Sequence, residues 1–243
     1  MTIAHRIRKL ALKFGIELNR YNPAQSQEAR MARLLAHHGI DLVLDVGANT
    51  GGYGISLRET GFQGDILSFE PLEQAHAELT RAASTDARWH IAPRMAVGAE
   101  NGEIEINVAG NSVSSSILPM HDAHAQAAPQ SRYVGSQRVP LSRLDSISHP
   151  VLASNRRTLL KIDTQGYEMS VLQGAKGLLP HIRGIQLELS IIPLYEGQTL
   201  YREAIEWLAG QGFELWNLIP GFLDESSGRL LQFDGIFFRN NQK

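Results

Sequence analysis

The sequence predicts an α/β fold in which a mostly parallel sheet carries helices on both of its faces. Short apolar runs, typical of strands that are buried on both faces, recur along the chain. Segments with a helical spacing of apolar residues lie between most of these runs. A glycine-rich turn follows the first run, as expected where a strand passes into a helix. Alternation of this kind is characteristic of parallel sheets with crossover helices.

The predicted strands are short. They cover residues 42–46, 65–69, 89–91, 159–163, 185–189 and 213–218. The predicted helices cover residues 26–38, 55–60, 72–83, 168–179 and 200–209. Near the C-terminus, residues 221–228 form a predicted turn between the strand at 213–218 and a last strand at 230–238. Because two strands joined in this way form a hairpin, the last strand is expected to be antiparallel.

Two segments depart from the alternation. Residues 103–108 read E-I-E-I-N-V, a period-two pattern that predicts a strand at a sheet edge. Residues 110–136 are rich in Ser, Ala, His and Pro and show little periodicity. A connection of this length in a compact domain is either a functional lid or a disordered insert. His121 and His124 lie in this segment, either as bases or as solvated surface residues.

Length and composition restrict the protein class. The chain of 243 residues predicts an N-terminal helical cap over residues 1–39 and one main domain over residues 40–243. A net charge of −2 argues against a dedicated nucleic-acid binder. The absence of cysteine excludes disulfides, thiolate metal ligands and cysteine nucleophiles.

The N-terminal segment has amphipathic character. Ile7, Leu10 and Phe14 recur at helical spacing, with basic residues between them. Such a helix either caps the domain core or makes peripheral contact with an anionic membrane surface. No apolar run approaches the roughly 18 residues that span a bilayer, and the segment lacks the features of a signal peptide. A cytoplasmic protein is therefore expected.

The strongest chemical signal is the sequence D-V-G-A-N-T-G-G at residues 45–52, where the first predicted strand ends. Glycines let the backbone turn sharply and approach a ligand, while the following helix presents free N–H groups. Glu70 ends the second strand, 19 residues after Gly51, where a carboxylate can accept both hydroxyl hydrogens of a ribose. Together these features predict an adenosine-type ligand, the alternative being a plain turn with surface carboxylates.

The residues of this turn distinguish between a phosphate-containing ligand and a cationic one. A dinucleotide site requires a glycine where this chain has Asn49, and no Lys or Arg lies between Gly47 and Leu57 to neutralise phosphates. Asp45 would repel a phosphate but suits a cationic ligand. S-adenosyl-L-methionine, which carries an ammonium and a sulfonium, matches this pattern. The predicted cofactor-binding residues are Asp45, Gly47, Asn49, Gly51 and Glu70.

Asp163 marks a second chemical centre, because it ends the predicted strand at 159–163, and carboxyl ends of parallel strands line the ligand crevice. Glu188 ends another strand of the same sheet. Both are predicted catalytic residues, acting either as a base or as oxygen ligands of a Mg²⁺ ion. Alternatively, Asp163 is an N-cap for the helix that begins at Glu168, and Glu188 is merely solvated. Tyr195 and Glu196, which follow, are candidates for substrate contact, whereas Trp89, Trp207 and Trp216 are expected in the core.

The chain resembles the FkbM family of S-adenosylmethionine-dependent methyltransferases. The resemblance rests on D-V-G-A-N-T-G (45–51), S-F-E-P (68–71), L-K-I-D-T-Q-G-Y-E (160–168) and V-L-Q-G-A (171–175). It extends from about Leu42 to Phe238 and implies a Rossmann-like seven-stranded methyltransferase sheet, mostly parallel with an antiparallel last strand. It also implies O-methylation, often of a sugar or polyketide hydroxyl. Where the family typically has Val-Glu, this chain has Thr164-Gln165, so any role of that glutamate does not carry over.

The acceptor is suggested by the same resemblance. Residues 5–18 and the Ser-rich loop at 107–116 are similar to family members that act on deoxyhexoses such as fucose. We therefore expect an O-methyltransferase for a sugar hydroxyl, with a glycolipid, glycan or other small molecule as acceptor and no nucleic-acid partner. The alternatives are an O-methyltransferase for a polyketide or other small-molecule hydroxyl, and a non-catalytic module that only binds the donor.

Overall fold

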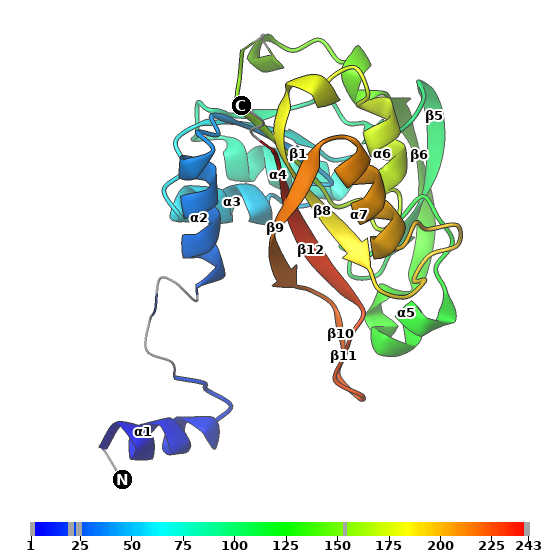
Figure 1. The fold of residues 1–243 in the computed structure, drawn as a ribbon. Coiled ribbons are helices and arrows are strands. Elements are labelled where there is room, and N and C mark those ends of the chain that lie inside the picture. The colour runs from blue at the N-terminus through cyan, green and yellow to red at the C-terminus, as the bar shows by residue number, and fades with distance from the viewer. Residues whose placement is uncertain (1–2, 19–21, 23–25, 153–154, 241–243) are drawn as a thin grey trace.

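A computed structural model describes residues 3–18, 22, 26–152 and 155–240 of the chain. Its centre is a seven-stranded sheet with the order β3-β2-β1-β7-β8-β12-β9 (Figure 1). The strands are β1 (Leu42–Val46), β2 (Asp65–Phe69), β3 (Trp89–Ile91), β7 (Thr158–Ile162), β8 (Ile182–Ser190), β9 (Phe213–Pro220) and β12 (Gln232–Arg239). Strand β12 runs antiparallel to both β8 and β9, and the other pairs are parallel. The predicted mostly parallel sheet with an antiparallel last strand is therefore confirmed.

Helices cover both faces of this sheet. One face carries α2 (Gln27–His37), α3 (Gly52–Glu59) and α4 (Glu73–Ala83), and the other carries α6 (Glu168–Gly174) and α7 (Tyr201–Gly210). Side chains of β1 alternate between the two cores: Val43 packs with α2 and α3, whereas Leu42 and Leu44 pack on the side of α6 and α7. All three are buried, which explains why this strand reads as a continuous apolar run.

A second, three-stranded sheet lies beside the first, with the order β4-β6-β5. Its strands are β4 (Ala96–Val97), β5 (Gly102–Ala109) and β6 (Tyr133–Ser142). Ile106 and Val139 from this sheet pack against Leu72 and Ala75 at the start of α4. The strand expected at 103–108 is therefore an edge strand, as predicted, but of this separate sheet.

The segment at 110–136 has more regular structure than its composition predicts. It contains α5 (Asp122–Ala127), the short 3₁₀ helix η1 (Pro129–Ser131) and the beginning of β6. Isolated bridges join Asn107 to Ser116 and Met120 to Tyr195. The prediction of a disordered insert is wrong for this segment, because these pairings attach it to both β5 and the loop that follows β8.

Short elements complete the chain. They are the 3₁₀ helices η2 (Leu144–Ser146), η3 (Pro150–Leu152) and η4 (Leu179–His181), and the two-stranded hairpin of β10 (Leu223–Asp224) and β11 (Arg229–Leu230). This hairpin lies in the predicted turn between β9 and β12. Trp216 on β9 is 45% exposed, so the prediction that it lies in the core is wrong, whereas Trp89 is buried as expected.

The N-terminal region contains two helices with different environments. Met31 and Leu35 of α2 are buried against the sheet. Helix α1 (Ile3–Leu12) instead exposes its apolar side chains, among them Ile7 and Leu10, and stands apart from the sheet in Figure 1. The packing that a cap would provide therefore comes from α2 and not from α1. Within the described residues, no helix combines the length and apolar character needed to cross a bilayer.

Candidate active site

The loop after β1 is shaped by a close approach between two strand ends. Gly47 has φ +78°, and a Cβ built on it would lie 1.8 Å from the backbone oxygen of Asp163. Only glycine therefore lets this loop pass the carboxyl end of β7. Asn49, also at positive φ, and Gly51 complete the turn into α3. The glycine predicted from the sequence is thus required by packing as well as by backbone conformation.

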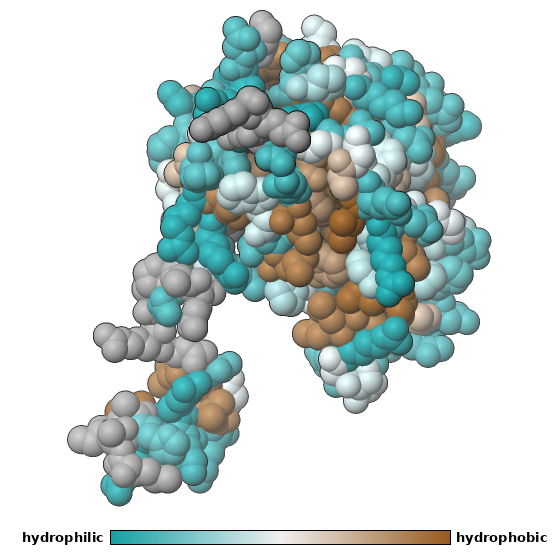
Figure 2. Space-filling view, viewed as in Figure 1, coloured by the Kyte–Doolittle hydropathy of each residue, from teal (hydrophilic) through white to brown (hydrophobic). Residues whose placement is uncertain are grey.

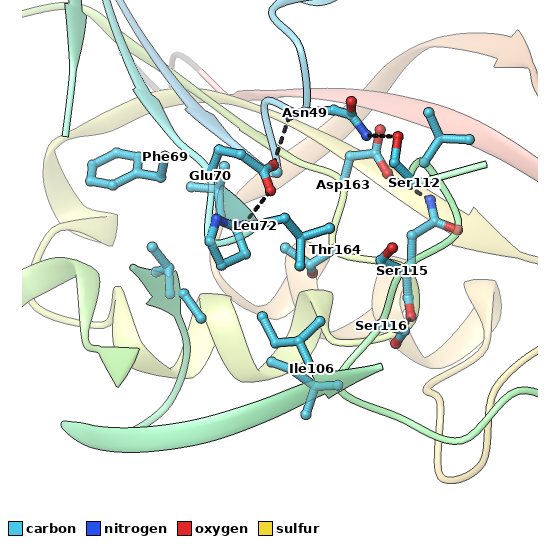
Figure 3. Close-up of a pocket in the computed structure, with 18 of the residues that line it drawn as sticks. Asn49, Phe69, Glu70, Leu72, Ile106, Ser112, Ser115, Ser116, Asp163 and Thr164 are labelled. Carbon is cyan, nitrogen blue, oxygen red and sulfur yellow. Dashed lines mark hydrogen bonds between the residues drawn. The ribbon is translucent and has the colours of Figure 1, made fainter. Parts of the chain in front are cut away.

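Glu70, at the end of β2, is held by backbone donors. Its carboxylate is buried and accepts the N–H of Asn49 and the N–H of Leu72, both at 2.8 Å (Figure 3). Burial raises the pKa of Glu70 to about 7, although the two backbone hydrogen bonds oppose that shift. Each carboxylate oxygen keeps a further acceptor site for a ligand. The side chain is therefore fixed in direction and able to accept hydrogen bonds from a pair of ligand hydroxyls.

A cavity of about 710 Å³, including its open mouth, lies between the two sheets. Beside Glu70, its wall is apolar and includes Leu72, Met95 and Ile106. The opposite wall is polar and is formed by Ser112, Ser115, Ser116, Asp163 and Gln165 (Figure 3). Neither lysine nor arginine is present among the described residues that line this cavity. Such a site suits a ligand with an apolar ring at one end and polar groups at the other.

Asp163 is linked to Glu188 through one amide. Gln165 Nε2 donates to Asp163 Oδ1 at 2.8 Å and to Glu188 Oε2 at 2.9 Å. The hydroxyl of the buried Tyr195 donates to Gln165 Oε1 at 2.8 Å, which fixes the orientation of the amide. Burial and the nearby Asp163 carboxylate raise the pKa of Glu188 well above its usual value. Glu188 therefore supports Asp163 from behind Gln165 and does not itself line the cavity.

Lys161 holds Asp163 from the other side. Lys161 Nζ lies 3.1 Å from Asp45 Oδ1 and 3.5 Å from Asp163 Oδ2. Burial acts to lower the pKa of Lys161, but the two carboxylates outweigh it and raise that pKa, so the ammonium stays charged. Asp45 is fully buried and also accepts the hydroxyl of Ser68 at 3.2 Å. Asp45 thus anchors Lys161 and does not face the cavity.

The predicted site residues therefore separate into two groups. Gly47, Asn49, Glu70 and Asp163 line the cavity. The other predicted residues do not line it. Asp45 contacts Lys161, Glu188 contacts Gln165, and Gly51 lies against Leu79 and Trp89.

Asp163 does not cap the following helix. Glu168 instead accepts the backbone N–H groups of Thr164 at 2.9 Å and of Gly166 at 3.0 Å, and so stabilises the turn before α6. The Asp163 side chain is 40% exposed and directed to the cavity. The alternative explanation of Asp163 as an N-cap is therefore wrong.

His124, a candidate base, and Tyr195, a candidate for substrate contact, do not reach the cavity. His124 is buried against Tyr195 and Phe222, and burial lowers its pKa to about 4. Tyr195 is itself fully buried and acts on the site through Gln165. The sequence did not predict the lining by Met95 and Ile106, since neither lies in a recognisable motif.

The Mg²⁺ alternative does not fit these residues. The described part of the chain contains no group of three or more His, Cys, Asp or Glu side chains placed to hold a metal ion. Between Asp163 and Glu188, the position that a cation would need is taken by the Gln165 amide, whose N–H groups point at both carboxylates. An amide donor repels a cation, whereas Mg²⁺ requires oxygen ligands. No step of the reaction is therefore assigned to a metal.

Comparison with protein families identifies the domain. The family model described as "Methyltransferase FkbM domain" matches residues 45–215, a span that runs from the end of β1 into β9. The chain belongs to the FkbM methyltransferase family. It is accordingly a methyltransferase that uses S-adenosyl-L-methionine. The glycine-rich loop at residues 47–51, Glu70 and Asp163 all lie inside the matched FkbM region.

The chain is also similar to solved structures at low sequence identity. Magnesium protoporphyrin IX methyltransferase from Synechocystis, with bound S-adenosylmethionine, has a TM-score of 0.48 and 11% identity, with 99% of this chain and 98% of that chain covered. An rRNA methylase from Streptococcus thermophilus has a TM-score of 0.47 and 10% identity, with 91% and 99% covered. TehB from Haemophilus influenzae has a TM-score of 0.48 and 11% identity, with 95% and 66% covered. No curated protein sequence matches the chain.

Proposed function

We propose that the protein is an O-methyltransferase that transfers the methyl group of S-adenosyl-L-methionine to a sugar hydroxyl of a glycolipid or glycan, such as a fucose-like deoxyhexose. The observation that carries this proposal is the position of Asp163. Its carboxylate lines the cavity at the carboxyl end of β7, opposite the Glu70 end, and is held there by Gln165 and Lys161. A fixed, accessible carboxylate at this point can receive the proton of an acceptor hydroxyl.

The lining residues favour one orientation of the donor. Its ribose hydroxyls donate to Glu70, and its adenine packs on the apolar wall formed by Leu72, Met95 and Ile106. The remainder of the donor then lies along the loop at Gly47 and Asn49, which line the cavity, toward Asp163. This orientation brings the transferable methyl group to the polar wall, where an acceptor enters.

The reaction needs the acceptor to be placed accurately. The acceptor oxygen attacks the methyl carbon, a C–O bond forms while the S–C bond breaks, and the sulfonium becomes a neutral thioether. The proton of the acceptor hydroxyl passes to Asp163. Alignment of the two reactants supplies roughly 7–11 kcal/mol of the barrier reduction. Proton removal by a positioned carboxylate contributes a further factor of about 10²–10⁴ in rate.

The polar wall favours a neutral, hydroxyl-rich acceptor. The Ser112 and Ser115 hydroxyls accept hydrogen bonds from Asn49 Nδ2 and from the Ala109 N–H, and each keeps its own hydrogen to donate to a sugar oxygen. The lack of lysine and arginine among the described lining residues disfavours acceptors that carry phosphates at the reacting end.

Transfer of a labelled methyl group tests this proposal. The protein is incubated with methyl-labelled donor and a panel of deoxyhexosides, neutral hexosides and polyketide alcohols, and products are identified by mass spectrometry. We expect methyl ethers on deoxyhexosides. Products confined to polyketide alcohols would overturn the sugar assignment, and N-methylated or C-methylated products would overturn O-methylation. Donor binding without turnover on the panel or on lipid extracts would indicate a non-catalytic module.

A further inference from the structure

Helix α1 presents a row of large apolar side chains to solvent. Ile7, Leu10 and Phe14, the last in the turn after the helix, recur at the spacing of one helical face and are 53%, 59% and 75% exposed. Exposed apolar groups of this size are normal when scattered, but a contiguous row indicates an interaction surface. In Figure 2 this region shows hydrophobic side chains beside hydrophilic ones, away from the main body. We call Ile7, Leu10 and Phe14 the apolar row.

Cationic side chains flank the apolar row on the same helix. By helical periodicity Arg6 and Lys13 lie beside Leu10 and Lys9 lies farther from the row, and all three are exposed. The whole N-terminal region shares this character: residues 1–39 contain seven Lys or Arg and two Asp or Glu, giving a net charge of +5. Since the chain carries −2 overall, residues 40–243 carry −7. Such an asymmetry indicates a polyanionic partner for the N-terminal region alone.

We propose that α1 binds flat on an anionic lipid bilayer. The apolar row lies at the boundary between headgroups and acyl chains, while Arg6, Lys9 and Lys13 contact the anionic headgroups. An amphipathic helix with a cationic polar face and aromatic or aliphatic side chains on the other face has the chemistry for this surface. The inference depends on α1 only and stands whatever the acceptor is.

Strand β9 presents a competing surface for the apolar row, but the charge around that surface is unfavourable. Strand β9 exposes Leu215, Trp216 and Leu218 at the edge of the main sheet. This strip is bordered by Arg30 and by other basic side chains of α2. Packing α1 there would bring two cationic helices together, which costs free energy through like-charge repulsion. The bilayer is therefore the better partner.

Vesicle co-sedimentation of the full-length protein tests the proposal. Vesicles of phosphatidylcholine alone are compared with vesicles of equal parts phosphatidylcholine and phosphatidylglycerol. We expect binding to the anionic vesicles only, decreasing as salt is added, because headgroup attraction is screened. Leu10→Asp and Lys9→Glu should each lower the partition coefficient by about tenfold or more.

Matched controls separate a bilayer contact from general effects of charge. Val134→Asp changes an exposed apolar residue of β6, and Lys176→Glu changes an exposed lysine after α6; both should bind like the wild type. Absence of binding to anionic vesicles would overturn the proposal, as would equal binding to neutral vesicles or an equal loss in the control variants. A Leu10→Asp variant that changes the oligomeric state in gel filtration without vesicle binding would show that α1 contacts protein instead, which also overturns it.

Discussion

Replacing Asp163 by asparagine is expected to lower the rate of methyl transfer by about 100-fold or more. Asparagine keeps the size of the side chain and an oxygen that accepts the hydrogen bond from Gln165 Nε2. It removes the carboxylate that receives the acceptor proton. Donor affinity and melting temperature should stay nearly unchanged, because Lys161 retains its closer partner Asp45 at 3.1 Å. The rate is measured with saturating labelled donor.

Glu225→Gln is the control for this variant, since it makes the same carboxylate-to-amide change in the exposed turn of the β10–β11 hairpin. It should retain full activity. Wild-type turnover in Asp163→Asn, with correct folding shown by circular dichroism, would exclude Asp163 as the proton acceptor. A collapse of melting temperature together with activity would mean that the residue acts mainly through the structure.

Replacing Glu70 by alanine is expected to weaken the binding of S-adenosylhomocysteine by about 100-fold or more. The reason is the loss of the acceptor for both ribose hydroxyls, since each hydrogen bond to a charged group contributes about 1.5–3 kcal/mol. Isothermal titration calorimetry measures the change. Glu73→Ala, three residues along in the exposed first turn of α4, is the matched control and should bind normally. Unchanged affinity in Glu70→Ala would remove Glu70 from the donor site.

The pH dependence of the same binding gives an independent check. In the ligand-free protein, burial raises the pKa of Glu70 to about 7. Below that pH the carboxyl group is neutral and must lose its proton to accept two hydroxyl hydrogens. Affinity should therefore fall as the pH drops through about 7, approaching tenfold per pH unit, and level off about one unit above the pKa. In Glu70→Gln this dependence should be absent.

Much of the fold could be predicted because each strand of the main sheet can be recognised from its own consecutive residues. The bounds of β1, β2 and β3 coincide with the predicted strands at 42–46, 65–69 and 89–91. Strands buried on both faces appear as uninterrupted apolar runs, and glycine or polar residues end them. Helix α3 begins at Gly52, three residues before the predicted start at residue 55. The prediction began too late because Gly52 and Gly54 disfavour a helix by propensity. Gly54 is nevertheless required, since a Cβ there would lie 2.2 Å from the Trp89 ring.

The second sheet could not be predicted in the same way. Strand β4 has only two residues, Ala96 and Val97, and pairs with Leu141 and Ser142 far along the chain. Pairing at such a distance leaves no local pattern, so the apolar wall that this sheet adds to the cavity was also missed. The exposed position of α1 could not be predicted either, because its amphipathic pattern is equally consistent with a core helix and with a surface helix.

The candidate site was predicted where it depends on strand ends and missed where it depends on side-chain direction. Gly47, Glu70 and Asp163 each follow the carboxyl end of a parallel strand, and all three line the cavity. Asp45 lies within β1, paired in register with Lys161 on β7, and therefore contacts that lysine. The bridging role of Gln165 depends on three separate segments meeting in space, which no sequence spacing reveals.

A crystal structure of the protein with S-adenosylhomocysteine would show whether the donor occupies this cavity. We expect both ribose hydroxyls within hydrogen-bond distance of the Glu70 carboxylate, with adenine against Leu72 and Ile106. We also expect the sulfur to face Asp163 across the polar end of the cavity. A ligand bound outside this cavity, ribose hydroxyls on other residues, or a sulfur turned away from Asp163 would contradict this placement of the donor.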